Sequence, residues 1–296
     1  MVLPLLLAAL LAAETPVVLA RQGPHALVAG PVAARELRYG PAERQSATLF
    51  TREKAVRAPL IVYLHGGGWS AGTPKAGSGG AQAEHWTGLG YAYATVGYRF
   101  VPEVALEEQV VDVARAVAAL RRRPEVDPDR IVLVGHSSGA HLAALIGADP
   151  AWLDKAGAPF EAVKAVVLLD AAGLDVPPII ANGRGAGVVE RFYRPAFGDD
   201  PSRQAALSPL RHSGPPDAPA WLMLHDVNNP LAGMQSRQLS AALIAAGARE
   251  ATVLPVADTT HVRLNDEIGK PLDKATAEID AFLARAFPEM QRPRRR

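Results

Sequence analysis

The sequence predicts an α/β fold with a mostly parallel central sheet flanked by helices. Six apolar runs have the length and composition of strands buried on both faces, which is typical of parallel sheets. They span residues 59–64, 91–96, 131–134, 163–169, 220–224 and 251–254. Segments of helical periodicity separate several of these runs, and such alternation favours right-handed crossovers within one sheet. One sheet accounts for the mature length, so we expect a single domain over residues 21–296.

The first strands and the helices follow from local patterns. Residues 34–39 and 47–51 read as two short strands around a turn. Apolar residues at steps of four and three then predict an amphipathic helix, which Pro124 and the turn at 127–129 end. These residues are Leu106, Val110, Val113, Val117 and Leu120. Three further helices are expected over residues 138–146, 235–246 and 273–287.

Residues 173–219 interrupt this alternation. The segment is rich in Gly, Pro and Arg, and only a short piece at 188–194 has helical character. Long irregular insertions in compact folds are usually binding loops or lids. We therefore expect an irregular, lid-like insertion here.

The N-terminus resembles a secretory signal. Residues 2–13 are almost continuously apolar but too few to span a bilayer, and small residues follow at 11–13 and 18–20. No Lys or Arg precedes the run, which leaves an N-terminal helix packed on the domain or a misassigned start as alternatives. We expect a signal peptide over residues 1–20 and a secreted or periplasmic protein, with a cytoplasmic one as the alternative.

Composition and charge exclude several classes of protein. The formal net charge is +1, which gives no general attraction to nucleic acid, and the basic residues 292–296 are expected to be a solvated tail. The chain has no cysteine, which excludes disulfides, thiolate chemistry and cysteine-based zinc sites. No pair of histidines has the spacing of a helical zinc site, so neither a metal nor another cofactor is expected. No stable membrane span is expected, and the sequence indicates no oligomeric state.

Gly135-His-Ser-Ser-Gly139 matches the G-x-S-x-G pattern of a nucleophile elbow. An apolar strand leads directly into it, and an Ala- and Leu-rich helix leaves directly from it. Such a turn requires small neighbours, which Gly135, Gly139 and Ala140 supply. The pattern predicts that Ser137 is a nucleophile; an incidental serine in a tight turn is the alternative.

His65-Gly-Gly-Gly-Trp69 follows an earlier strand and predicts an oxyanion hole. Acyl transfer places negative charge on a carbonyl oxygen, which fixed backbone N–H donors stabilise. We assign the N–H groups of Gly67 and Gly68, together with that of Ser138. A phosphate-binding loop is disfavoured because no Gly-Lys-Ser/Thr follows the glycines.

His261 is the expected general base. It follows the last strand and precedes the last helix, in the chain order Ser…Asp…His of such hydrolases. Of the other seven histidines, His65 and His136 belong to the two motifs and His141 to the helix behind the elbow. His225 ends a strand, but at the place expected for the acid.

These motifs make the chain similar to bacterial α/β-hydrolases of the esterase/lipase superfamily. The resemblance is strongest to the branch of kynurenine formamidase-like and feruloyl or acetyl esterase-like proteins, and it runs from about residue 35 to 288. It is carried by residues 65–69, Tyr98-Arg99, 127–131, 135–143, Ser208-Pro209, His261 and Gly269. It implies the α/β-hydrolase fold and serine-hydrolase chemistry without a cofactor.

The acid is where the sequence departs from its relatives. In the superfamily the acid often lies four residues after a strand-end histidine, and the matching residue here is Asn229. Asp226 is the nearest carboxylate to that strand end, and a carboxylate stabilises an imidazolium far better than an amide does. We expect Asp226 to be the acid, with Asn229 as a neutral alternative. Asp258 and Asp266 lie too near His261 in sequence for the usual geometry.

The predicted function is hydrolysis of small to medium carboxylic esters through an acyl-enzyme formed on Ser137. The resemblance also implies an alternative, hydrolysis of an N-formyl aryl-amine of the N-formylkynurenine type. The missing carboxylate at Asn229 leaves a third possibility, a degenerate hydrolase that binds a ligand without turnover.

Overall fold

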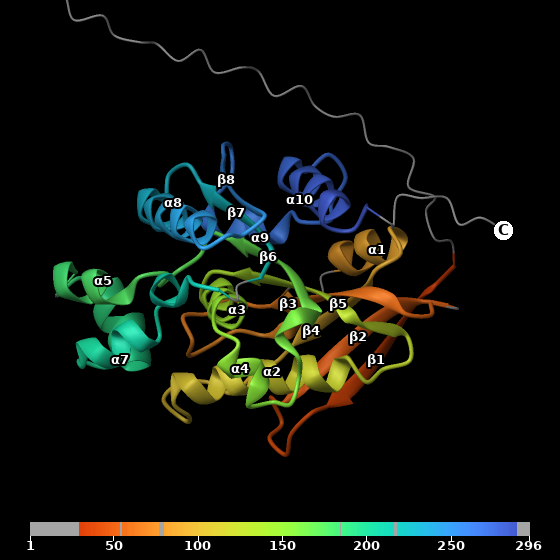
Figure 1. Ribbon diagram of the computed structural model, residues 1–296, viewed down its shortest axis with the longest axis horizontal. Coiled ribbons are helices and arrows are strands. Elements are labelled where there is room, and N and C mark those ends of the chain that lie inside the picture. The colour runs from red at the N-terminus through yellow and green to blue at the C-terminus, as the bar shows by residue number, and fades with distance from the viewer. Residues whose placement is uncertain (1–29, 54, 77–79, 184, 216–217, 289–296) are drawn as a thin grey trace, which may run out of the picture.

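One eight-stranded sheet runs through the part of the chain that the computed structural model describes, which is residues 30–53, 55–76, 80–183, 185–215 and 218–288 (Figure 1). The strand order is β1-β2-β4-β3-β5-β6-β7-β8. β1 and β2 pair antiparallel, as do β2 and β4, and every other pair is parallel. The predicted α/β class with a mostly parallel sheet is therefore confirmed. The expected signal peptide at 1–20 and the basic tail at 292–296 lie outside the described residues.

All eight strands occur where apolar or alternating runs predict them. They are β1 (Val32–Arg38), β2 (Ser46–Arg52), β3 (Ala58–Leu64), β4 (Ala92–Val96), β5 (Val126–His136), β6 (Val163–Leu169), β7 (Ala220–Asp226) and β8 (Glu250–Val256). β3 shows why the central runs are continuously apolar. Leu60, Val62 and Leu64 enter the core on one face of the sheet, whereas Ile61 and Tyr63 enter the core on the other. Every residue of such a strand is buried, because helices cover both faces.

Helices lie on both faces of the sheet (Figure 1). α1 (Ala81–Gly88), α9 (His261–Asp266) and α10 (Lys274–Ala286) cover one face. α2 (Leu106–Leu120), α3 (Ser138–Ala148), the short α4 (Ala151–Asp154) and α8 (Pro230–Ala245) cover the other. The five apolar residues that predict α2 are all buried. α8 begins earlier than predicted, because Asn229 caps it and Pro230 is its first residue.

The lid-like insertion consists of short helical pieces joined by turns. They are α5 (Val176–Asn182), the π-helical turn η3 (Val189–Tyr193), α6 (Arg194–Phe197), α7 (Pro201–Ala206) and the 3₁₀ turn η4 (Pro209–His212). α5, α6, α7 and η4 each carry proline in the first turn, which starts a helix readily but prevents it from extending backwards. Figure 1 shows α5 and α7 grouped at one end of the molecule.

The order of the strands places the functional motifs together at the carboxyl ends of the central strands. The chain passes from β3 to β4 on one side of β3 and then returns to β5 on its other side. In open α/β sheets, ligands bind beyond the carboxyl ends of the strands at such a switch point. The glycine turn follows β3 and the serine turn follows β5, so both lie there. Among the helices of the described residues, none is long and apolar enough to cross a membrane.

Candidate active site

Ser137 occupies a strained turn between β5 and α3. Its φ of 55° and ψ of −120° are unfavourable for a residue with a side chain, and its backbone N–H donates to the Leu169 carbonyl at 3.0 Å. Gly139 permits the tight approach of α3 to the sheet. A Cβ atom there would lie 2.3 Å from the backbone oxygens of Leu64 and His65. The predicted strand–turn–helix setting of Ser137 is therefore present.

The glycine turn after β3 lies directly against the serine. A Cβ atom on Gly66 would come within 3.1 Å of Ser137 Cβ. Gly67 and Gly68 have φ values of 135° and 60°, and their N–H groups have no acceptor among the described residues. Ser138 is the first residue of α3, where an N–H has no partner within the helix. The three donors assigned from the sequence are thus available to an oxyanion beside Ser137.

Two aromatic residues hold the glycine turn in place. The Tyr98 hydroxyl donates to the His65 carbonyl at 2.6 Å, and the Tyr98 ring stacks on the His65 imidazole with centroids 4.4 Å apart. The indole N–H of buried Trp69 donates to His141 Nδ1 at 3.2 Å. Burial lowers the pKa of His65 and of His141 to about 4, so both are neutral at physiological pH. These histidines therefore support the turn as neutral hydrogen-bonding groups.

His261 pairs with Asp170. His261 is the first residue of α9, and its Nδ1 lies 2.6 Å from Asp170 Oδ2. Asp170 follows β6 directly, its side chain is fully buried, and its φ is 45°. Because a carboxylate only accepts, Nδ1 carries the proton and Nε2 has a lone pair. The imidazole is 44% exposed, which leaves it accessible from outside.

The structure corrects the expected partner of His261 from Asp226 to Asp170. The Asp226 carboxylate instead accepts from the backbone N–H and side-chain amide of Asn228, at 2.9 and 3.1 Å. Asp226 contacts the pair only through its backbone N–H, which donates to Asp170 Oδ1 at 3.2 Å. Asn229, the alternative acid, donates from Nδ2 to Asp170 Oδ2 at 3.0 Å.

The order of the strands explains this correction. β6 lies between β5 and β7, so a residue at its carboxyl end is one strand away from Ser137. Asp170 satisfies the order Ser…Asp…His as well as Asp226 does. The signal in the sequence was a carboxylate directly after the apolar run 163–169. The family pattern around His225 favours the next strand instead.

Burial and hydrogen bonds act in opposite directions on Asp170. Burial raises the pKa of its carboxyl, but the hydrogen bonds from His261 and Asn229, the charge of His261 and the N–H of Asp226 together lower it below its ordinary value. Asp170 is therefore ionised at neutral pH.

His136 connects the serine turn to the histidine loop. Its Nε2–H donates to the His261 carbonyl at 2.8 Å, and the two rings lie 4.6 Å apart. Burial, and then the neighbouring His261, lower the pKa of His136 to about 4. No hydrogen bond joins Ser137 Oγ to His261 among the described residues. Catalytic hydrogen bonds often tighten only when substrate binds.

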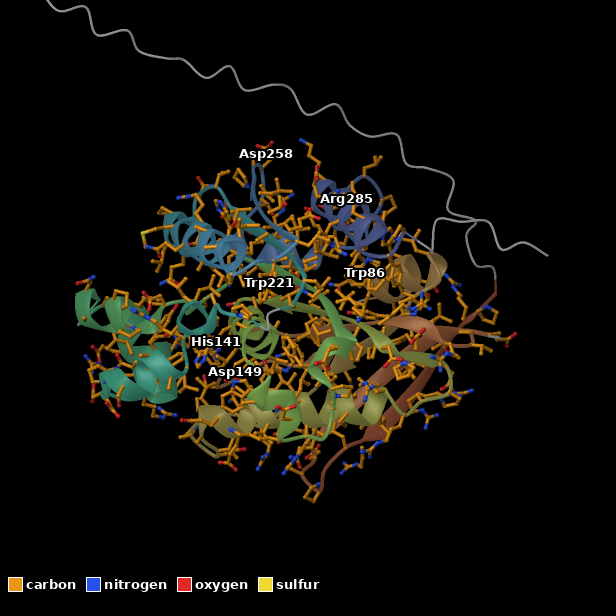
Figure 2. All side chains as sticks on the ribbon, viewed as in Figure 1. Trp86, His141, Asp149, Trp221, Asp258 and Arg285 are labelled. Carbon is orange, nitrogen blue, oxygen red and sulfur yellow. The ribbon has the colours of Figure 1, made fainter. Side chains whose placement is uncertain are left out.

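The insertion packs on the glycine turn. A Cβ atom on Gly68 would lie 2.3 Å from Cδ1 of Phe192, so this ring from η3 covers the glycine. Trp69 packs edge-on against Tyr193 and Phe197, with centroids 5.2 and 4.9 Å apart. Figure 2 shows His141, which bonds to Trp69, between the sheet and the insertion helices. Phe192 therefore forms part of the wall of the site, which the sequence did not reveal.

These groups supply the parts of a nucleophilic acyl transfer. They are a strained serine, an imidazole held in one tautomer by a buried carboxylate, and N–H donors beside the serine. Among the described residues there is no cluster of three or more His, Asp or Glu side chains that could hold a metal ion.

Several known proteins are similar to this chain. Residues 49–172 match the family described as BD-FAE, and this range contains the glycine turn, Ser137 and Asp170. Esterase LipQ of Mycobacterium tuberculosis is 28% identical over 262 residues, which cover 81% of this chain. The chain spans only 59% of that relative. Kynurenine formamidase of Salmo salar is 30% identical over 109 residues, 36% of each protein.

A solved structure supports the fold. The crystal structure of esterase B from Lactobacillus rhamnosis aligns with a TM-score of 0.70 at 20% identity, and the alignment covers 92% of this chain and 88% of that one. At this identity the similarity concerns the arrangement of strands and helices.

Proposed function

We propose that this chain, which has the α/β-hydrolase fold that its sequence predicts, is a serine esterase acting on carboxylic esters of small to medium acyl chain. One arrangement carries the proposal. Ser137 stands on a strained turn beside the free N–H groups of Gly67 and Gly68, and the His261–Asp170 pair lies at the same end of the parallel strands.

The chemistry follows from these positions. Ser137 Oγ attacks the ester carbonyl while His261 Nε2 accepts its proton. The N–H groups of Gly67, Gly68 and Ser138 bind the oxyanion of the tetrahedral intermediate. The intermediate collapses with cleavage of the ester C–O bond, and His261 returns the proton to the leaving alcohol. Water then attacks the acyl-enzyme in the same way, while Asp170 stabilises the imidazolium in both steps.

Asp170 argues against a degenerate hydrolase. That possibility rested on the missing carboxylate at Asn229, and Asp170 supplies a buried carboxylate to the same imidazole. The esterase relative supports ester hydrolysis, because it matches most of this chain. Formamide hydrolysis is the second candidate, favoured by the formamidase relative over a much shorter range.

A hydrolysis panel tests this function. p-Nitrophenyl esters of increasing acyl length are compared with N-formylkynurenine, using wild type, Ser137→Ala and Ser202→Ala, the last being an exposed serine on α7. We expect esters to be preferred and Ser137→Ala to lower kcat by roughly 10⁶. Fluorophosphonate labelling should disappear in that variant alone. A folded, active Ser137→Ala enzyme would overturn the assignment, and a higher kcat/KM for N-formylkynurenine would reverse the ranking.

We also propose that the protein is exported, acting in the periplasm or outside the cell. The support is the apolar run at residues 2–13 and the small residues at 11–13 and 18–20. Mass spectrometry of protein from its native host should find a chain that starts after Ala13 or Ala20. An intact Met1 in the cytosolic fraction would contradict export.

A further inference from the structure

The side chain of Asn229 makes two hydrogen bonds, which join helix α8 to the His261–Asp170 pair. Its Oδ1 accepts from the backbone N–H of Ala232 at 3.2 Å, which caps α8. Its Nδ2 donates to Asp170 Oδ2 at 3.0 Å. His261 Nδ1 lies 2.6 Å from the same Oδ2. Asp170 Oδ2 therefore accepts hydrogen bonds from both the Asn229 amide and the His261 imidazole.

The helix cap fixes which end of the amide faces the acid. The backbone N–H of Ala232 can only donate, so the atom facing it is the amide oxygen. The NH₂ group must then face Asp170, where it acts as a donor to a buried carboxylate. The other carboxylate oxygen, Oδ1, accepts the backbone N–H of Asp226 at 3.2 Å. Asp170 is thus held by β7 and the start of α8 as well as by His261.

We propose that Asn229 is a positioning residue of the active site, whose amide holds the Asp170 carboxylate oriented toward His261. This inference rests on the proposed function. The superfamily pattern would place the acid itself at Asn229, whereas here the amide serves a carboxylate that comes from the neighbouring strand.

The surrounding charges agree with this role. The hydrogen bond from Asn229 contributes to the lowered pKa of Asp170. The titratable groups around the carboxyl are His261 on α9, His136 at the end of β5 and the Asp226 side chain at the end of β7, with Asp266 acting on His136. The Asp170 carboxylate is itself an acceptor, so the amide supplies a donor where a second carboxylate would be repelled.

Two substitutions separate the cap from the contact with Asp170. Asn229→Ser keeps an oxygen for the Ala232 N–H but removes the donor to the carboxylate. Asn229→Asp also keeps the cap but places a carboxylate oxygen against Asp170 Oδ2, where two like charges repel. Asn228→Ser is the matched control, because the Asn228 amide contacts Asp226 and not Asp170.

The experiment measures kcat, KM, the pH profile of kcat/KM and Tm on one short-chain ester. We expect Asn229→Ser to lower kcat about tenfold with KM nearly unchanged, and to lower Tm as well, because the buried Asp170 carboxylate loses one charge-assisted hydrogen bond. Asn229→Asp should lower kcat at least as much and move the acidic limb of the profile to higher pH, because added negative charge stabilises the imidazolium. Asn228→Ser should behave as wild type.

Some results would overturn the inference. A gain of activity in Asn229→Asp would mean that this position is the acid site. An Asn229→Ser enzyme with altered Tm but wild-type kcat and pH profile would mean that Asn229 only caps α8. The downfield proton resonance of His261 Nδ1–H, measured without substrate, should shift in Asn229→Ser and not in Asn228→Ser. This signal tests the contact even if wild type fails to hydrolyse esters, which would refute the proposed function separately.

Discussion

Replacing Asp170 by asparagine tests the acid most directly. The two carboxylate oxygens accept from three donors, namely His261, Asn229 and the backbone N–H of Asp226. An amide has one oxygen, so its NH₂ group must face a donor in either orientation. If it faces His261, Nδ1 becomes the acceptor and the proton moves to Nε2, which then has no lone pair for the proton of Ser137. If it faces Asp226 instead, the NH₂ group opposes a backbone N–H that cannot change its role.

The expected magnitude follows from the loss of the correct tautomer. In serine proteases the same exchange lowers kcat by about 10⁴, which corresponds to about 5.4 kcal/mol of activation free energy. An unsatisfied buried donor adds a cost of about 1–3 kcal/mol in stability. We therefore expect Asp170→Asn to be folded, with a lower Tm and a nearly complete loss of turnover.

Asp226→Asn is the matched comparison. Its side chain keeps an oxygen for Asn228 Nδ2 and for the Asn228 backbone N–H, and its own backbone N–H still reaches Asp170. We expect kcat within a few-fold of wild type. Steady-state kinetics of both variants on one p-nitrophenyl ester decide the matter. A severe loss in Asp226→Asn together with an active Asp170→Asn would refute the assignment of Asp170.

Three further predictions concern the same region. Because the pKa of Asp170 is lowered in the folded protein, its ionisation stabilises the fold above the ordinary pKa of Asp, and this contribution is lost as pH falls through the lowered value. Urea unfolding should therefore show a stability difference between wild type and Asp170→Asn that is large at pH 7 and shrinks in acid; a constant difference would contradict this. Phe192→Ala should raise kcat/KM for longer acyl esters relative to acetate, because the ring lies on Gly68, and Val188→Ala, which truncates an exposed apolar side chain of the same segment, should not. Gly139→Ala should lower the free energy of unfolding by more than about 3 kcal/mol, since its Cβ would meet two backbone oxygens, and a soluble variant of wild-type Tm would disprove that account.

The sequence predicts the parts of this site whose signals are local. Strand β5 runs straight into the serine turn and α3 leaves from it, so the neighbours of Ser137 in sequence are also its neighbours in space. The same holds for the glycine turn after β3. The partner of His261 is different, because Asp170 lies 91 residues away and is chosen by the order of the strands. Two carboxylates follow apolar strands, and only the positions of β6 and β7 distinguish them.

Contacts of the insertion with distant parts of the chain could not be predicted from the sequence either. Its prolines and short helical piece are visible in the sequence, but the contact between Phe192 and Gly68 is not. Nothing in the composition of 173–219 indicates which of its aromatic residues faces the glycine turn. The ring of Trp69, which lies far from the insertion in sequence, also packs against Tyr193 in η3 and Phe197 in α6.

Trp69 has a consequence for how this protein can be altered. It immediately follows the glycines that we propose bind the oxyanion, and its ring packs against Tyr193 and Phe197 of the insertion. The insertion and the proposed oxyanion turn therefore share contacts with one buried side chain. Exchanging the insertion for that of another hydrolase, a common route to a new substrate range, would disturb the rate along with the selectivity. Donor segments that keep an aromatic residue at both contacts with Trp69 are the ones that should transfer selectivity alone.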